Sequence, residues 1–167
     1  TDNPQEKMYL LNHYLEQFRG TVYRQTMFAE FEKITHERVE AGDALTPENL
    51  GELYLELNKK YYGPEVEMDD NICAEWARIP HFYSAFYVYK YATGFSAATA
   101  IKQSILEEGQ PAVDRYLDFL KSGSSDYPIN LLKKAGVDLT TPEPVEKALT
   151  YFSKLLDEFE KLAFSAV

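Results

Sequence analysis

Residues 3–22 read NPQEKMYLLNHYLEQFRGTV, and this stretch decides the fold class. Its apolar residues recur every three or four positions, which is the spacing of one face of a helix. Asp2 or Asn3 can cap the start, and the proline falls in the first turn, where its missing N–H is not needed. We therefore predict a long helix over residues 4–40, with Gly20 as the point where it can kink. The apolar face consists of Met8, Leu11, Leu15, Phe18 and Val22.

Later helices are predicted from two signals, a capping residue followed by proline and an apolar spacing behind it. Thr46-Pro47-Glu48 starts one of them, and Thr141-Pro142-Glu143 starts the last. No alternating strand pattern lasts more than a few residues. The fold is therefore predicted to be all-α, with one helical domain over residues 1–167. The segments expected after the first helix are residues 47–62, 72–78, 82–106, 110–120, 128–135 and 142 onward.

The charge, the apolar runs and the cysteine count of the chain exclude some classes of function. The net charge of −10 argues against a nucleic-acid partner, which would need clustered Lys and Arg. No run of about 18 apolar residues is present, so no membrane span is expected. Cys73 is the only cysteine and cannot form an internal disulfide, which favours a reducing, cytoplasmic setting. The chain opens with Thr1 and no initiator Met, which suggests a piece of a longer protein.

Residues 76–95 hold eight aromatic side chains in 20 positions. If a helix starts at Phe82, Phe86 and Tyr89 share its face, while Tyr83, Tyr87 and Tyr91 share another. The ordinary interpretation is a core helix. The alternative is a wall of hydrogen-bond donors facing a substrate, because buried phenols need partners that phenylalanine would not. Both interpretations stay open on the pattern alone.

The three histidines and the absence of known catalytic motifs limit which catalytic or metal-binding sites this chain can form. His13 and His36 lie on the first predicted helix and are interpreted as surface or core residues. His81 follows a proline just before the tyrosines, and a local hydrogen bond and a functional role are both open for it. The sequence has no H-E-x-x-H, no glycine-rich phosphate loop, no C-x-x-C and no G-x-S-x-G. We therefore expect no metal ligands in this chain and no bound catalytic zinc.

Two segments carry a family resemblance. Residues 79–94, IPHFYSAFYVYKYATG, resemble a signature near the C-terminus of oligoendopeptidase F, a zinc metallopeptidase of the thimet-oligopeptidase type. Residues 18–32, FRGTVYRQTMFAEFE, are similar to the helix that follows the metal site in that family. Tyr61-Tyr62-Gly63 and the run from Trp76 to His81 occur in the same order. The similarity extends over nearly the whole chain.

The resemblance implies the C-terminal portion of a mostly helical, zincin-like catalytic domain that hydrolyses short peptides. In that family an H-E-x-x-H helix and a later Glu bind zinc, and these residues would precede Thr1. Zinc is therefore expected in the full-length enzyme and not in this chain. The expected partners are short peptides and the missing N-terminal part of the same enzyme. Self-association of the isolated piece is also expected, through faces that would otherwise be covered.

The resemblance also implies roles for individual residues. His81 and Tyr89 are expected to be catalytic, donating hydrogen bonds to the oxyanion of the tetrahedral intermediate, and Tyr83 and Tyr87 to bind substrate. The family's Tyr-Tyr-x-Tyr core aligns with residues 86–89, which puts Phe86 at a tyrosine position. If the alignment is shifted by one residue, Tyr83 and Tyr87 match family tyrosines, but Lys90 then stands where the last tyrosine of the core should be. Tyr91 is interpreted as a packing residue.

Two other classes of function remain. The chain could be a non-catalytic helical module that binds a peptide or a partner helix through its aromatic residues. It could also be purely structural. An H-E-x-x-H motif in the coding sequence before Thr1 would favour the peptidase over both. On the peptidase hypothesis, the isolated chain is expected to be inactive.

Overall fold

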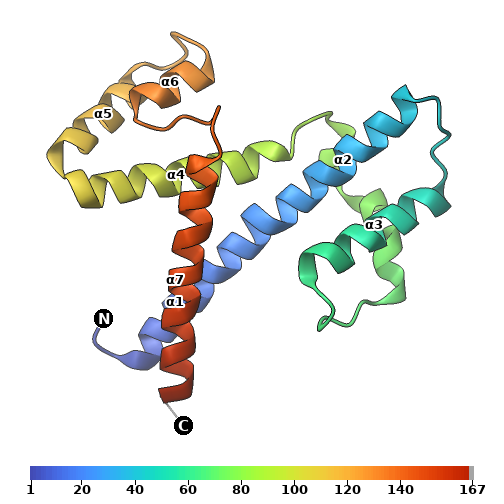
Figure 1. The fold of residues 1–167 in the computed structure, drawn as a ribbon, viewed down its shortest axis with the longest axis horizontal. Coiled ribbons are helices and arrows are strands. Elements are labelled where there is room, and N and C mark those ends of the chain that lie inside the picture. Colours follow the sequence, from blue (N-terminus) through green and yellow to red (C-terminus); the bar gives the residue numbers. More distant parts are fainter. Residues whose placement is uncertain (166–167) are drawn as a thin grey trace. The chain divides into compact units, whose positions relative to one another are not determined.

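The computed structural model describes residues 1–165, and within this range the chain forms helices and no strand (Figure 1). The all-α prediction is confirmed. Contacts between Cα atoms gather in two compact units, one of residues Gly20–Ala92 and one of Thr1–Arg19 with Thr93–Val167. A single domain over the whole chain stays a prediction. No helix among the described residues is long and apolar enough to cross a membrane.

The first predicted helix is present in three consecutive parts. Helix α1 covers Pro4–Phe18, and the Asn3 side chain caps it by accepting the N–H groups of Gln5 and Glu6. A π-helical segment, η1, follows at Arg19–Tyr23, and α2 covers Arg24–Glu40. Gly20, the expected kink position, therefore lies in a π-helical segment. Such insertions are the usual local irregularity inside a long helix.

The unit of residues Thr1–Arg19 and Thr93–Val167 contains α1, α4 (Tyr89–Glu108, mostly in this unit), α5 (Gln110–Lys121), α6 (Pro128–Lys134) and α7 (Glu143–Ser165). Helix α1 packs along α7, and an ion pair joins Lys7 to Glu158. The fully buried Phe18 ring touches Phe95, with ring centroids 4.8 Å apart, and Phe152, at 5.3 Å. Helices α5 and α6 pack against each other (Figure 1).

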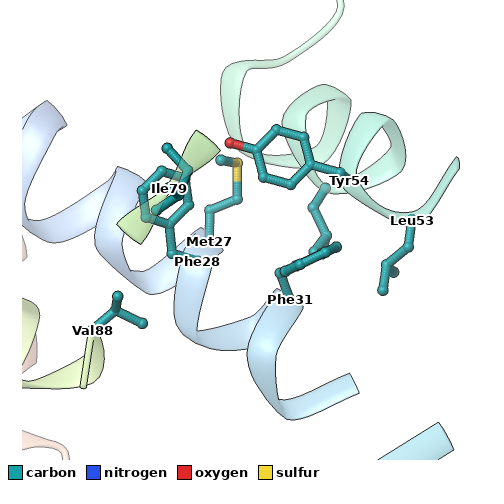
Figure 2. Packing of buried hydrophobic residues seen from close by; sticks show 8 residues of the cluster. Met27, Phe28, Phe31, Leu53, Tyr54, Ile79 and Val88 are labelled. Atoms are coloured by element: carbon teal, nitrogen blue, oxygen red, sulfur yellow. The ribbon is translucent and has the colours of Figure 1, made fainter. Parts of the chain in front are cut away.

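The unit of residues 20–92 is built by α2, α3 (Pro47–Tyr62), and two 3-10 helices, η2 (Asp70–Arg78) and η3 (Pro80–Tyr83). The predicted Thr46 cap is present, because its Oγ1 accepts the N–H of Asn49 while the Asn49 side chain accepts the N–H of Thr46. Figure 2 shows Met27, Phe28 and Phe31 of α2 packed with Tyr54 of α3. The complete buried cluster is Met27, Phe28, Phe31, Leu53, Tyr54, Leu57, Ile79 and Val88.

One sequence prediction is wrong. The helix expected from Phe82 begins only at Tyr89, where α4 starts, and residues 84–88 form a bend and turns. Phe86 has φ +55°, a left-handed conformation that a right-handed helix cannot contain. The two aromatic stripes proposed on a continuous helix from residue 82 therefore do not form over residues 82–88.

A buried carboxylate ties η2 to both long helices of this unit. Glu75 Oε1 accepts from Arg24 Nη2 of α2 at 2.8 Å and from Arg78, while Oε2 accepts from the Tyr54 hydroxyl of α3 at 2.7 Å. Burial alone would raise the pKa of Glu75. The hydrogen bonds from Tyr54 and Arg24 and the charges of Arg24 and Arg78 outweigh burial and hold that pKa below its usual range. Glu75 thus stays ionised and connects three elements.

The close approach of α3 and η2 generates a first prediction. A Cβ at Gly51 of α3 would lie 3.1 Å from the backbone oxygen of Cys73. We expect Gly51→Ala to lower the free energy of unfolding by about 1 kcal/mol, because overpacking against backbone outweighs the better helix propensity. Gly94→Ala in α4 is the matched control, since nothing lies within 4 Å of its added Cβ. It should be neutral or stabilising in urea unfolding, and equal effects at both sites would contradict the prediction.

The Glu75 network generates a second prediction. Because the pKa of Glu75 is lower in the folded chain, its carboxylate stabilises the fold above the unfolded-state pKa of about 4.3, and this contribution disappears as the pH falls through the folded-state pKa. Glu75→Gln should lower the free energy of unfolding at pH 7 by about 1.5–3 kcal/mol. It should also flatten the loss of stability below about pH 4.5, because that loss requires the carboxylate.

Urea unfolding at pH 7 and at about pH 3.5 measures both effects. Glu37→Gln is the control, because Glu37 forms only an exposed ion pair with Lys33. Its effect should stay below about 0.5 kcal/mol. A Glu75 variant that matches this control at both pH values would contradict the proposed importance of the network.

Candidate functional site

His81 stands directly after the segment that Glu75 holds. Ile79 is buried in the core and Pro80 begins η3, so the chain entering His81 is fixed from the core side. The imidazole of His81 is partly buried and stacks on the ring of Tyr87, with centroids 5.3 Å apart and planes 17° from parallel. The two residues that sequence analysis assigned to different roles thus lie in contact.

Tyr91 completes a group of three side chains, the His–Tyr cluster of His81, Tyr87 and Tyr91. The Tyr91 hydroxyl lies 3.3 Å from His81 Nε2 and donates to the Tyr87 hydroxyl, also at 3.3 Å. This hydrogen bond to Tyr87, with a smaller effect of desolvation, raises the pKa of Tyr91. Its phenol therefore stays protonated at neutral pH and remains a donor. Sequence analysis placed Tyr91 on one face with Tyr83 and Tyr87 but interpreted it as a packing residue, and so missed its place in this cluster.

The proton count assigns a direction to this cluster. A tyrosine hydroxyl has one proton to donate, and the proton of Tyr91 goes to Tyr87. With that proton on Tyr87, the Tyr91 oxygen is left to accept from His81 in the tautomer protonated at Nε2. The hydroxyl proton of Tyr87 has no acceptor among the residues that the structure describes. Tyr87 is 38% exposed, so it can donate this proton to a ligand.

The other two predicted site residues are placed differently. Tyr83 is 80% exposed, and its hydroxyl donates to the backbone oxygen of Ala77 at 3.2 Å. Tyr89 is the first residue of α4 and is 50% exposed. Lys90, next to Tyr89, places its Nζ 5.0 Å from the centre of the Tyr87 ring, a cation–π contact. These contacts join His81 to Tyr87 and Tyr91, and hold Tyr83 on the backbone of η2.

Glu32 is the second residue that sequence analysis missed. It lies on α2 within residues 18–32 of the resemblance, yet no role was assigned to it. Its Oε1 accepts the backbone N–H of Phe86, 54 positions later. Phe86 is the residue with positive φ, and its ring lies against the ring of His36, with centroids 4.6 Å apart. No pattern in the local sequence indicates so distant a hydrogen bond.

A zinc ion does not fit the residues present. Among residues 1–165 no group of three or more His, Cys, Asp or Glu side chains could hold a metal ion. The buried carboxylates Glu75 and Glu32 are occupied by arginine, tyrosine and backbone donors. The described part of the chain therefore offers hydrogen-bond donors to a ligand and no metal-binding cluster.

Comparison with known proteins agrees with this description. The chain is 58% identical over 161 residues to oligopeptidase PepF of Bacillus subtilis, covering 96% of this chain and 24% of that protein. It is 47% identical over 167 residues to the chromosomal oligoendopeptidase F of Lactococcus lactis subsp. cremoris, covering 100% of this chain and 28% of the relative. The chain thus spans about a quarter of the length of these relatives.

Solved structures give the same result. The crystal structure of oligoendopeptidase-F from Enterococcus faecium matches with a TM-score of 0.96 at 50% identity, over 99% of this chain and 32% of that one. A putative peptidase from Chlamydophila abortus matches with a TM-score of 0.90 at 42% identity, over 97% of this chain and 27% of that one. The sequence profile described as peptidase family M3 matches residues 1–151. With these relatives, the chain belongs to peptidase family M3 and is of the oligoendopeptidase F type.

Proposed function

We propose that this chain forms the substrate-facing wall of a zinc metalloendopeptidase that hydrolyses short peptides. The observation that carries the proposal is the His–Tyr cluster, in which hydrogen bonds run from His81 through Tyr91 to Tyr87. Family membership supplies the reaction class, peptide hydrolysis. The single cysteine, Cys73, agrees with a cytoplasmic setting for this enzyme.

Peptide hydrolysis passes through a tetrahedral intermediate whose former carbonyl oxygen carries negative charge. Donors already aimed at that oxygen stabilise the transition state more than the substrate. Tyr87 can donate its free hydroxyl proton, and the two bonds behind it strengthen that donation because successive hydrogen bonds polarise one another. His81 acts at the start of this series as a donor that Tyr91 needs. Besides Tyr87, we propose Tyr89, half exposed at the start of α4, as an oxyanion donor. Tyr83 is exposed, and we propose that it contacts the substrate together with Tyr87.

Zinc, in the full-length enzyme, would supply an activated water. We place its ligands outside this chain, in the part of the relatives' length that these residues do not cover, because the described residues assemble no metal-binding group. The role of this chain is to bind the peptide and to donate hydrogen bonds as charge develops.

The proposed roles of the His–Tyr cluster and of Tyr89 are tested in the full-length enzyme by His81→Ala, Tyr87→Phe and Tyr89→Phe. Loss of Tyr87 or Tyr89 as an oxyanion donor, or of His81 as the donor behind Tyr91, should lower kcat by about 10²–10³-fold with a smaller change in KM. Tyr127→Phe is the matched control, because Tyr127 is an exposed tyrosine in the other unit and should leave kcat unchanged. If His81→Ala and Tyr89→Phe both leave kcat/KM within about twofold of the parent enzyme, the assignment is wrong.

The isolated chain should bind no stoichiometric zinc and hydrolyse no peptide. The reason is the missing three-ligand group in residues 1–165 together with the missing H-E-x-x-H motif. Metal analysis after dialysis against excess zinc, and a fluorogenic peptide assay on the same sample, measure both. One zinc per chain, or turnover that follows the chain through purification, would refute the expectation.

A non-catalytic peptide-binding module is the second candidate. It is favoured by the exposure of four aromatic side chains within residues 83–89: Tyr83, Phe86, Tyr87 and Tyr89. Peptide affinity of the isolated chain, with no loss of hydrolysis in the full-length His81 variant, would favour this candidate over the peptidase wall.

A further inference from the structure

Glu32 is a buried carboxylate whose burial calls for a physical reason. Only 4% of its surface is exposed, and no Lys or Arg of the described chain forms an ion pair with it. Burying a charge without a partner is costly. Among residues 1–165, the Glu32 side chain has one hydrogen bond, from the backbone N–H of Phe86. That bond must therefore offset much of the cost of burial.

The residue that Glu32 holds is itself strained. A non-glycine residue at φ +55° is unfavourable and persists only where its surroundings hold it. Here α2 holds Phe86 twice. Glu32 binds its N–H, and His36, one turn further along, packs against its ring. The His36 Nδ1–H in turn donates to the backbone oxygen of Glu32 at 2.7 Å.

The turn at Phe86 decides where Tyr87 goes. The N–H of Tyr87 donates to the backbone oxygen of Ser84 at 3.2 Å, which closes a turn over residues 84–87. The Tyr87 ring then reaches the His81 ring. In an uninterrupted helix, residues six apart would lie about 120° apart around the axis and about 9 Å along it, too far to stack. The stacked pair of His81 and Tyr87 therefore requires the turn.

We propose that Glu32 is a positioning residue of the peptidase site, acting through Phe86 to hold Tyr87 against His81. It touches neither substrate nor the His–Tyr cluster directly. The kinetic part of this inference rests on the proposed function, whereas the structural part, that Glu32 holds the turn, does not.

Three variants separate the effects of the charge, the length and the hydrogen-bonding capacity of the Glu32 side chain. Glu32→Gln keeps an acceptor at the same distance and loses the charge. Glu32→Asp keeps the charge but is one methylene shorter, and Glu32→Ala removes the acceptor. Glu30→Ala is the matched control on the same helix, because Glu30 binds Lys60 and Tyr61 of α3 and lies outside the turn.

Amide hydrogen exchange of the full-length enzyme over residues 84–88 is the first readout. The Phe86 amide should exchange about 10- to 100-fold faster in Glu32→Ala and Glu32→Asp, and near the parent rate in Glu32→Gln and Glu30→Ala. The second readout is kcat, which should fall by about 10²-fold in the same two variants, because displacement of a catalytic donor by about 1 Å has an effect of this size. Glu32→Gln should keep most of the parent kcat. In all the Glu32 variants KM should change less than kcat.

The outcomes are distinct. Equal exchange at Phe86 in all variants overturns the inference whatever the activity. Faster exchange with unchanged kcat, in an enzyme that His81→Ala impairs, overturns the positioning role and leaves the proposed function standing. If His81→Ala is itself without effect, the proposed function fails, and exchange alone decides whether Glu32 holds the turn. If Glu32→Ala does not fold, the contrast between Glu32→Asp and Glu32→Gln decides in the same way.

Discussion

Within residues 20–92, the structure depends on the carboxylate of Glu75, because it is the point where α2, α3 and η2 share hydrogen bonds. Two guanidinium groups and a phenol compensate its burial, so the ion stays charged and the three elements stay connected. A 3-10 helix has poorer hydrogen-bond geometry than an α-helix and holds its shape weakly by itself. The placement of His81, which follows η2 by three residues, is therefore set by this ion and the buried Ile79 more than by local structure.

The segment from His81 to Tyr89 has one anchor before it and one within it. Glu75 holds the chain before His81, and Glu32 holds it at Phe86. Both carboxylates come from the interior and neither reaches the exposed surface of the cluster. A site built on irregular backbone needs such support, because side chains on an unsupported loop vary in position by more than catalysis tolerates. The two buried acids supply the rigidity that a helix through this segment would otherwise have given.

The sequence was sufficient for most of the fold, because its signals were local. The Asn3 and Thr46 caps and the prolines at helix starts act within a few residues of where they occur. The start of α4 was beyond such reasoning. No glycine or proline breaks residues 82–91, and their aromatic spacing suits a helix. The break occurs where a carboxylate 54 positions earlier accepts the Phe86 N–H. His81 and Tyr87 were predicted as site residues and lie together, whereas Tyr91, interpreted as a packing residue, joins them through its hydrogen bonds.

The same break explains the tyrosine that the family alignment seemed to lack. The alignment of the family's Tyr-Tyr-x-Tyr core with residues 86–89 puts Phe86 at a tyrosine position. In the structure the Phe86 ring instead lies against His36, an apolar contact for which a hydroxyl is not needed. The phenols that meet His81 come from Tyr87, after the turn, and from Tyr91, one helical turn later. A phenylalanine at position 86 thus suits its place as the anchor of the turn, and the hydroxyl chemistry passes to the residues that the turn brings to His81.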